Sequence, residues 1–490
     1  MTLFRRIIAL IVFASTVLTA IACAENTDTD EHVTERITES TTDDGRIYPD
    51  LPEETFDNKE FWILQWYRGE NHPHNHFEYY VEEEIGEVLN DAIYFRNKTI
   101  EDRYEVVIKA DGVENPAETI RMSTASFDFK HHFVADIPRR LLGYSMSGEY
   151  LEFSTIPYLD ISKPWWNENS QKAFSMNGRL YVISGDYVLY EKQRVFAIIF
   201  NRDMAEEFHL GDLYATAEKG NWTVEEMLRC VKIVTEDVNS DGWMDYDDDR
   251  FGFMSCSYTY ISSLLFGMGN RFSEKDSEDI PYMVAKSERM YDSIEKLSGV
   301  IFSDNTLWGE VVTNNWVKAH SPAFVFNSGN TLFYHEILYD ARNMDTDIEY
   351  GILPQPKYDS EQTDYYTTVQ YGNSGAIAIP KNNNDLDFTG IILEALAAES
   401  RYTTYPTFVE TVLKVKDTPD EQAKKMLDVI FDGIVYDVAD AFDFGGIVNI
   451  FNNKLYHSKQ NNMYSSYDNI ERYILDALED TVDRYEELEY

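Results

Sequence analysis

The strongest chemical pattern in the chain is a run of oxygen-bearing side chains from Asp237 to Asp248. Oxygen donors stand at its first, third, fifth and ninth positions, a carboxylate stands at the twelfth, and Gly242 occupies the sixth. Hard oxygen ligands on alternating residues converge on one cation when a glycine lets the chain turn sharply between them. The spacing predicts a structural calcium ion (Ca²⁺) held by Asp237, Asn239, Asp241, Asp245, Asp248 and the backbone carbonyl of Trp243.

The same loop has an alternative interpretation that needs no metal. Asp248 stands where calcium loops of this spacing prefer the longer glutamate. A chain with 87 acidic residues also produces chance matches more often than an average protein does. A turn stabilised by Asp and Asn side chains would use the same residue types.

Sequence signatures of enzymes are missing from the chain. It contains no HExxH, GxSxG or GxxxxGK[ST] pattern, and Gly372 to Gly375 lacks the spacing of a nucleophile elbow. Carboxylates are too frequent for inspection to exclude a glycosidase pair, although no single pair stands out. The sequence therefore favours a protein that is not an enzyme, with a secreted glycan-active enzyme as an alternative.

The first 22 residues have the pattern of a secretory signal. Arg5 and Arg6 precede an apolar run from Ile7 to Ala22, which is short for a membrane-spanning helix. Small residues lead directly to Cys23, as in the signals of bacterial lipoproteins. We expect residues 1–22 to be removed and Cys23 to be lipidated, which would anchor the protein at the extracellular face of a Gram-positive cell membrane. A plain signal peptide is the alternative.

Composition describes the remaining chain as an acidic, aromatic-rich globular protein. The 490 residues suit two or three domains, and the apolar share of 43% can build substantial cores. The formal net charge of −45 repels phosphate backbones, so no nucleic-acid partner is expected. Residues 23–55 are polar and acidic and are predicted to form a disordered tether. Cys230 and Cys256 could pair outside the cell, but the sequence does not set their distance.

Apolar periodicity predicts alternating strands and helices, the rhythm of an α/β protein. Strands are expected near residues 61–66, 104–110 and 193–201. Helices are expected over residues 82–103, 116–126, 385–400, 420–432 and from about 467 to the end. Thr223 and Glu226 have the spacing of a capping box, which predicts a helix that ends just before the acidic loop.

Short segments in a specific order carry a resemblance to a known family. These segments are residues 91–97, 157–166, 177–181, 184–186, 200–202, 221–227, 251–253, 351–358 and 390–400. Each is weak alone, but together, over about residues 56–490, they resemble the family 1 extracellular solute-binding lipoproteins of ABC importers.

The resemblance implies an α/β fold with two lobes, the type 2 periplasmic-binding-protein fold, with hinge crossovers and a ligand cleft. Lobe I would comprise residues 56–192 and 366–435, and lobe II would comprise residues 193–365 and 436–490. The family layout places the first crossover near Gln193 and the return near residues 367–378.

The resemblance also implies a function: a monomer that captures a carbohydrate, an oligosaccharide above all, and delivers it to membrane-bound ABC permease subunits. Aromatic rings cover the flat faces of sugars, while carboxylates and amides bind the hydroxyls. The candidate ligand contacts are Trp66, Trp165, Trp166 and Tyr371 for stacking, and Asp186, Asn373 and Asp443 for hydroxyls. No organic cofactor is expected. Alternatives are another solute such as a peptide, a glycan-active enzyme, and a sugar-binding signalling or adhesion module.

Overall fold

The computed structural model describes residues 45–69, 78–245, 247–308, 322–339, 348–372, 374–413 and 421–488. The chain divides into two units, Met1–Tyr48 and Pro49–Tyr490, and the second unit contains all the helices and strands described below. Within the described residues, no helix combines the length and apolar content that a membrane crossing requires. The predicted lipidation site Cys23 lies outside them.

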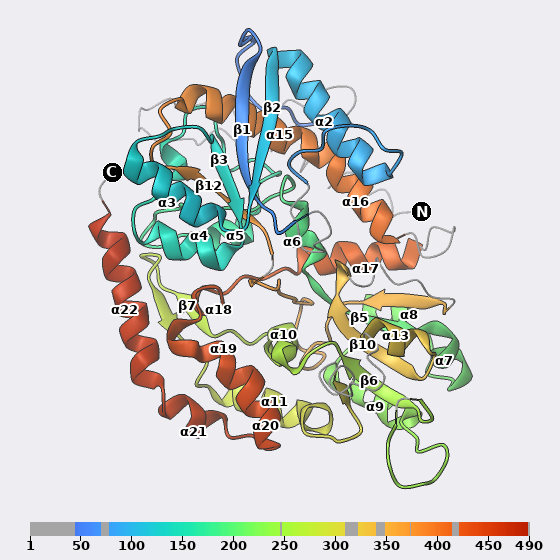
Figure 1. The fold of residues 1–490 in the computed structure, drawn as a ribbon. Helices are drawn as coiled ribbons and strands as arrows, with labels where there is room; N and C mark the ends of the chain where they lie inside the picture. Colours follow the sequence, from blue (N-terminus) through green and yellow to red (C-terminus); the bar gives the residue numbers. More distant parts are fainter. Residues whose placement is uncertain are drawn as a thin grey trace, which may run out of the picture. The chain divides into compact units, whose positions relative to one another are not determined.

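The first sheet lies in lobe I and combines strands from two distant parts of the chain (Figure 1). Its order is β2-β1-β3-β12-β4, with β1 parallel to β2 and β3, and β12 antiparallel to β3 and β4. The strands are β1 (Lys59–Trp66), β2 (Val106–Val113), β3 (Phe133–Asp136), β4 (Tyr150–Leu151) and β12 (Ala376–Pro380). Helices packed around it include α2 (Val88–Tyr104), α3 (Pro116–Ser126), α4 (Pro138–Ser145), α15 (Leu386–Tyr402) and α16 (Thr404–Leu413).

The second sheet lies in lobe II and has the order β11-β5-β10-β6-β9. Its strands are β5 (Phe196–Asn201), β6 (Phe251–Ser255), β9 (Leu307–Trp308), β10 (Thr331–Ile337) and β11 (Tyr350–Leu353). Around it lie α7 (Arg202–Glu207), α8 (Leu213–Glu218), α9 (Val224–Val234), α10 (Ile261–Gly267), α11 (Glu288–Ile301) and α13 (Pro322–Asn327). Helix α17 (Glu421–Asp432) packs on β11 of this sheet and also on α16. A separate hairpin pairs β7 (Ser273–Lys275) with β8 (Pro281–Met283).

Three chain segments cross between the two lobes and lie side by side. Residues 194–196 and 367–370 are joined by hydrogen bonds from Phe196 N to Thr368 O at 3.2 Å and from Gln370 N to Arg194 O at 3.0 Å. Residues 433–435 join the other edge, because Val435 N donates to Thr367 O at 2.8 Å. Isolated β-bridges join the three segments, and their few residues are the hinge between the lobes.

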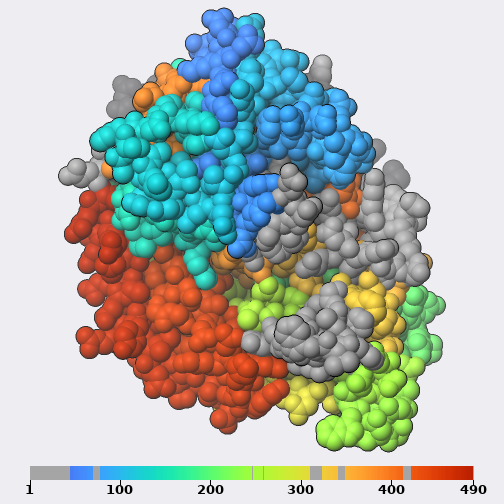
Figure 2. Space-filling model, in the orientation of Figure 1, coloured from blue at the N-terminus to red at the C-terminus, as the bar shows by residue number. Residues whose placement is uncertain are grey.

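The C-terminal segment, residues 436–488, contacts lobe I as well as the rest of lobe II. Its main helices are α18 (Val438–Phe442), α21 (Met463–Asp468) and α22 (Glu471–Glu487). Tyr485 on α22 bonds the hydroxyl of Ser145 on α4 at 2.7 Å, whereas Lys286, in the segment that follows β8, pairs with Asp468 at 2.5 Å. In Figures 1 and 2 these red residues lie beside the teal residues of lobe I.

Several shorter elements also lie among the described residues. They are η1 (Phe153–Thr155), α5 (Glu168–Phe174), α6 (Leu189–Gln193), η2 (Tyr258–Tyr260), η3 (Phe444–Gly446), α19 (Ile447–Asn449), η4 (Ile450–Lys454) and α20 (Leu455–Ser458).

Local chemistry explains where the predicted elements begin. The helix expected over residues 116–126 is α3 with the same bounds, since Asn115 caps it by accepting from Glu118 N at 3.2 Å. The helix expected from residue 82 begins only at Val88, because Gly86 has a φ of +80° and Glu87 is the cap. Thr223 caps α9 as predicted, but Glu226 pairs with Arg229 at 2.7 Å, so the capping box is half formed.

Candidate ligand-binding site

A cavity of about 260 Å³ lies where the hinge meets both lobes. Lobe I contributes Arg139 from α4, and lobe II contributes Tyr260 from the end of η2 and Ser262 from α10. Residues 368–372 of the second crossing segment form another wall, and Asp440 on α18 belongs to the C-terminal wall. A ligand in this cavity would therefore touch both lobes and the hinge at once.

Three aromatic residues line the cavity, and they differ in how much of each ring is accessible. Tyr371 is 3% exposed, and its hydroxyl accepts a hydrogen bond from Asp437 N at 2.8 Å. The Tyr260 ring is only partly buried, lies 4.8 Å from the ring of Phe196, and its hydroxyl accepts from the side-chain amide of Gln370. Tyr260 is therefore the aromatic surface most available to a ligand.

Polar groups in the cavity wall retain hydrogen-bonding capacity. The Asp440 side chain is 7% exposed, and among the described residues no donor bonds its carboxylate. Burial, together with the nearby charge of Asp437, raises the pKa of Asp440 well above its usual range. The Oε1 atom of Gln370 is also buried without a hydrogen-bond partner. Buried polar atoms without partners are costly, so ligand groups that bond them would gain affinity.

Arg139 joins lobe I to the C-terminal wall of the cavity. Its Nη2 donates to the backbone oxygen of Asp440 at 3.0 Å, and its Nε donates to that of Ala441 at 3.2 Å. Its Nη1 lies 3.8 Å from Asp443 Oδ2. The guanidinium thus holds α18 against α4 at the mouth of the cavity.

Comparison with known proteins identifies the fold. No protein-family model and no curated sequence matches the chain. An ABC substrate-binding protein from Listeria monocytogenes in complex with cycloalternan matches with a TM-score of 0.52 at 12% identity, over 88% of this chain and 100% of that one. A cyclo/maltodextrin-binding protein complexed with maltotetraose matches with a TM-score of 0.54 at 12% identity, over 88% and 99%. The chain has the two-lobe fold of substrate-binding proteins.

A third structure agrees with this assignment. The GacH receptor of Streptomyces glaucescens, solved without ligand and with acarbose, matches with a TM-score of 0.50 at 9% identity, over 88% of this chain and 98% of that one. The α/β fold class inferred from the resemblance, with its two lobes and hinge crossovers, is therefore confirmed.

One of the predicted ligand contacts lines the cavity, and a second lies beside it. Tyr371 lines it, and Asp443 adjoins it through Arg139. Burial raises the pKa of Asp443, although Val448 N donates to its carboxylate at 3.0 Å. Asn373, the third predicted residue of this region, lies outside the described residues.

The predicted tryptophan contacts lie elsewhere, in the interior of lobe I. Trp165 is fully buried and Trp166 is 3% exposed, and both indoles donate to the carboxylate of Glu394, at 3.1 and 2.9 Å. Burial raises the pKa of Glu394 to about 8. Trp66 is 2% exposed, and its ring lies 5.7 Å from the guanidinium of Arg140. None of the three lines the described cavity, so a ligand contact for them stays a prediction.

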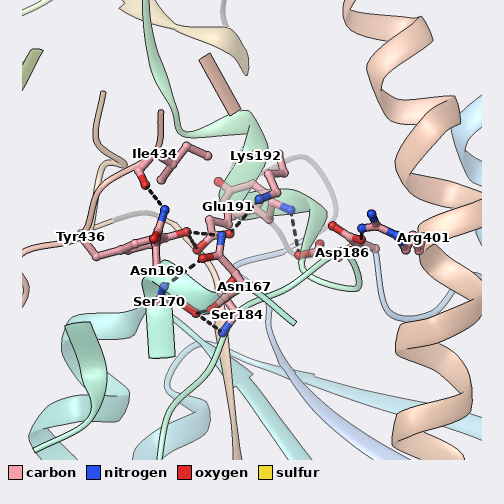
Figure 3. A network of polar contacts seen from close by, with 12 residues as sticks. Asn167, Asn169, Ser170, Ser184, Asp186, Glu191, Lys192, Arg401, Ile434 and Tyr436 are labelled. Carbon is pink, nitrogen blue, oxygen red and sulfur yellow. Dashed lines mark hydrogen bonds and ion pairs between the residues drawn. The ribbon is translucent and has the colours of Figure 1, made fainter. Parts of the chain in front are cut away.

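Asp186 belongs to a buried polar network beside the hinge, shown in Figure 3. Its Oδ2 pairs with Arg401 Nη1 at 2.7 Å, and burial raises its pKa. Close by, Tyr436 donates to Glu191 at 2.6 Å, while Asn169 donates to the backbone oxygen of Ile434 at 3.0 Å. The network fastens α5 and α6 of lobe I to the third crossing segment. Asp186 does not line the described cavity, so its ligand contact stays a prediction.

The acidic loop forms a series of side-chain-to-backbone bonds. Gly242, with a φ of +85°, donates to Asp237 Oδ2 at 2.9 Å, and Asp241 N donates to Asn239 Oδ1 at 2.9 Å. The other carboxylate oxygen of Asp237 is buried without a hydrogen-bond partner, which a cation would satisfy. Within the described ranges, no three His, Cys, Asp or Glu side chains come together as a metal site. The calcium site stays a prediction.

The two cysteines of lobe II are not joined by a disulfide. Cys230 is buried in α9, and burial raises the pKa of its thiol to about 11. A thiol with so high a pKa is a poor nucleophile, so this residue has a packing role.

Arg139, Tyr260 and Asp440 are among the cavity residues that sequence reasoning missed. Asp440 lies in α18, three residues before the predicted Asp443, which ends that helix as its C-cap. Tyr260 immediately precedes the apolar run that becomes α10. Neither position differs in the sequence from many other acidic or aromatic residues of this chain.

Proposed function

We propose that this chain is an extracellular solute-binding lipoprotein that captures an oligosaccharide between its lobes and delivers it to the permease subunits of an ABC importer. The observation that carries the proposal is the cavity at the hinge, where an accessible tyrosine ring adjoins buried, unpartnered oxygen atoms. Rings and oxygen acceptors together match the faces and hydroxyls of a sugar. Structural neighbours in complex with cycloalternan and with maltotetraose support the ligand class.

The mechanism follows from the position of the cavity. A sugar that touches Arg139 on lobe I and Tyr260 on lobe II stabilises the conformation in which both contacts form. The three paired crossing segments supply the hinge for that closure. The closed monomer, anchored through a lipid on Cys23 outside the cell, would then dock on the permease and release the sugar unchanged.

A panel of oligosaccharides tests this function. Thermal unfolding is measured with each sugar, and hits are confirmed by tryptophan fluorescence titration and by analysis of the sugar afterwards. We expect the melting temperature to rise with at least one oligosaccharide, and we expect that sugar to be recovered intact. Released reducing ends would instead indicate a glycan-active enzyme, and a response to peptides alone would indicate another solute.

Replacing Tyr260 by alanine is expected to weaken binding of the best panel sugar about tenfold, or about 1.4 kcal/mol. The loss reflects removal of the accessible ring, so Tyr260→Phe should retain most of the affinity. Isothermal titration measures both variants. Tyr473→Ala removes a tyrosine that is 68% exposed on α22 and serves as the matched control. Equal affinity of Tyr260→Ala and the wild type would contradict a stacking role.

We also propose that calcium binds the loop from Asp237 to Asp248 and stabilises it. At a free calcium concentration about 100 times the dissociation constant, the folded protein should gain about 2.7 kcal/mol. Differential scanning calorimetry with calcium and with a chelator measures the resulting rise in melting temperature. Asp237→Ala should abolish it, whereas Asp247→Ala, outside the predicted ligand set, should keep it. Identical melting curves with and without calcium would refute the site.

A further inference from the structure

We propose that the sugar taken by the hinge cavity carries a basic nitrogen, and that its ammonium group pairs with Asp440. The inference rests on the proposed function and narrows its ligand class from oligosaccharides in general to amine-bearing ones. The observations that carry it are the distribution of charge and of satisfied hydrogen bonds around the cavity.

Two neighbouring carboxylates on one helix differ in how they are satisfied. Asp437, at the start of α18, accepts hydrogen bonds from Phe272 N at 2.7 Å and from the hydroxyl of Ser273 at 2.8 Å, in addition to three further backbone amides. Asp440, one turn later, faces the cavity with no such donors, although 93% of its surface is buried. The protein therefore provides hydrogen-bond donors for Asp437, whereas a donor for Asp440 would have to come from a ligand in the cavity.

Arg139, the nearby cationic side chain, donates no hydrogen bond to the carboxylate of Asp440. Arg139 donates to backbone carbonyl oxygens, and the carboxylate nearest to its Nη1 is that of Asp443, at 3.8 Å. Arg139 is the sole basic side chain among the described residues that line the cavity. One guanidinium thus faces two carboxylates, Asp440 and Asp443, and the site has a net deficit of positive charge.

This deficit discriminates between ligand classes. An anionic ligand would approach two carboxylates in a partly dry cavity and be repelled. An uncharged sugar could offer only hydroxyl donors to Asp440, with no positive charge to offset that of the carboxylate. An ammonium group would hold Asp440 in its ionised form, against the burial that raises its pKa, and would form a charge-assisted hydrogen bond, which is shorter and about twice as strong as a neutral one. The amine is therefore the ligand group that gains most from this wall.

A matched pair of tetrasaccharides tests the inference. The β-1,4-linked glucosamine tetramer and cellotetraose differ only in an amine or a hydroxyl on each ring, and isothermal titration at about pH 6 keeps the amines protonated. We expect the wild type to bind the amine at least about tenfold more tightly. In Asp440→Asn this ratio should fall to about one, whereas Asp440→Glu should restore a preference.

Two controls separate the pairing from general attraction to an acidic protein. Asp476→Asn removes an equal charge from an exposed position on α22 and should leave the ratio unchanged. High salt should also leave the preference largely intact, because screening acts mainly on exposed charges. If Asp440→Asn keeps the full preference, or if salt and Asp476→Asn abolish it, the pairing with Asp440 is refuted.

The outcomes also separate this inference from the proposed function. Binding of an uncharged panel sugar, with no gain for the glucosamine tetramer, overturns the amine preference and leaves oligosaccharide capture standing. Failure to bind every oligosaccharide, charged or uncharged, contradicts both.

Discussion

Replacing Glu394 by alanine is expected to lower the free energy of unfolding by about 4 kcal/mol. The glutamate is 1% exposed and is the acceptor for the indole nitrogens of both Trp165 and Trp166. Alanine would leave two buried N–H groups without acceptors and would also open a cavity inside lobe I. Urea denaturation followed by tryptophan fluorescence measures the change.

Glu479→Ala is the matched control, because this glutamate is exposed on α22. Its effect should stay within about 0.5 kcal/mol. A loss below about 1 kcal/mol for Glu394→Ala would show that the indoles find other partners, and would contradict the structural role assigned to the carboxylate.

The same glutamate should make stability depend on pH. Its pKa is raised from 4.5 to about 8 in the folded state, so the folded protein binds the proton more tightly than the unfolded chain does. The resulting stabilisation is fully present below about pH 4.5 and is lost as pH rises through about 8. Glu394→Gln cannot titrate, so the difference between wild-type and variant unfolding free energies should decline across that window. If the difference in unfolding free energy does not change with pH, the raised pKa of Glu394 is contradicted.

Replacing Gly390 by alanine is the second change with a large expected effect. The glycine lies in α15, and an added Cβ would stand 1.8 Å from the backbone oxygen of Pro157. No side chain can rotate away to relieve that contact, so α15 or the loop at Pro157 must shift. We expect a loss of at least about 3 kcal/mol in the free energy of unfolding.

Gly143→Ala provides the control for this substitution. Gly143 lies in α4, and an added Cβ there meets nothing within 4 Å. Because alanine favours a helix more than glycine does, this variant should be neutral or stabilised by up to about 1 kcal/mol. Denaturation of both variants in parallel measures the two changes in unfolding free energy. Equal changes would contradict the clash between the added Cβ at Gly390 and the backbone of Pro157.

Periodicity in the sequence was sufficient for most of the secondary structure. The apolar run at residues 61–66 lies within β1, the helix at 116–126 is α3, and the helix expected over 385–400 corresponds to α15, for which Asp385 is the N-cap. These predictions succeed because burial of one face imposes a period of two or 3.6 residues on the local sequence. The C-terminal helix was less predictable. One continuous helix was expected from about residue 467, whereas the structure has two helices, α21 and α22.

The candidate site was harder to predict than the elements that form it. Its walls come from α4, η2, the second crossing segment and α18, which are far apart in the chain. Tyr371 and Asp443 were expected near the ligand through the resemblance. Arg139, Tyr260 and Asp440 have no local feature that separates them from similar residues elsewhere in this chain.

The sequence by itself determined the acidic charge, the alternation of strands and helices and, through its resemblance, the two-lobe fold. Only the tertiary structure decided which aromatic rings reach the cavity. Trp165 and Trp166 were plausible ligand contacts until Glu394, more than 220 residues away in the chain, proved to be their partner. Local periodicity indicates that one face of an element is buried. Which residues cover that face depends on long-range packing, and no short stretch of the sequence specifies it.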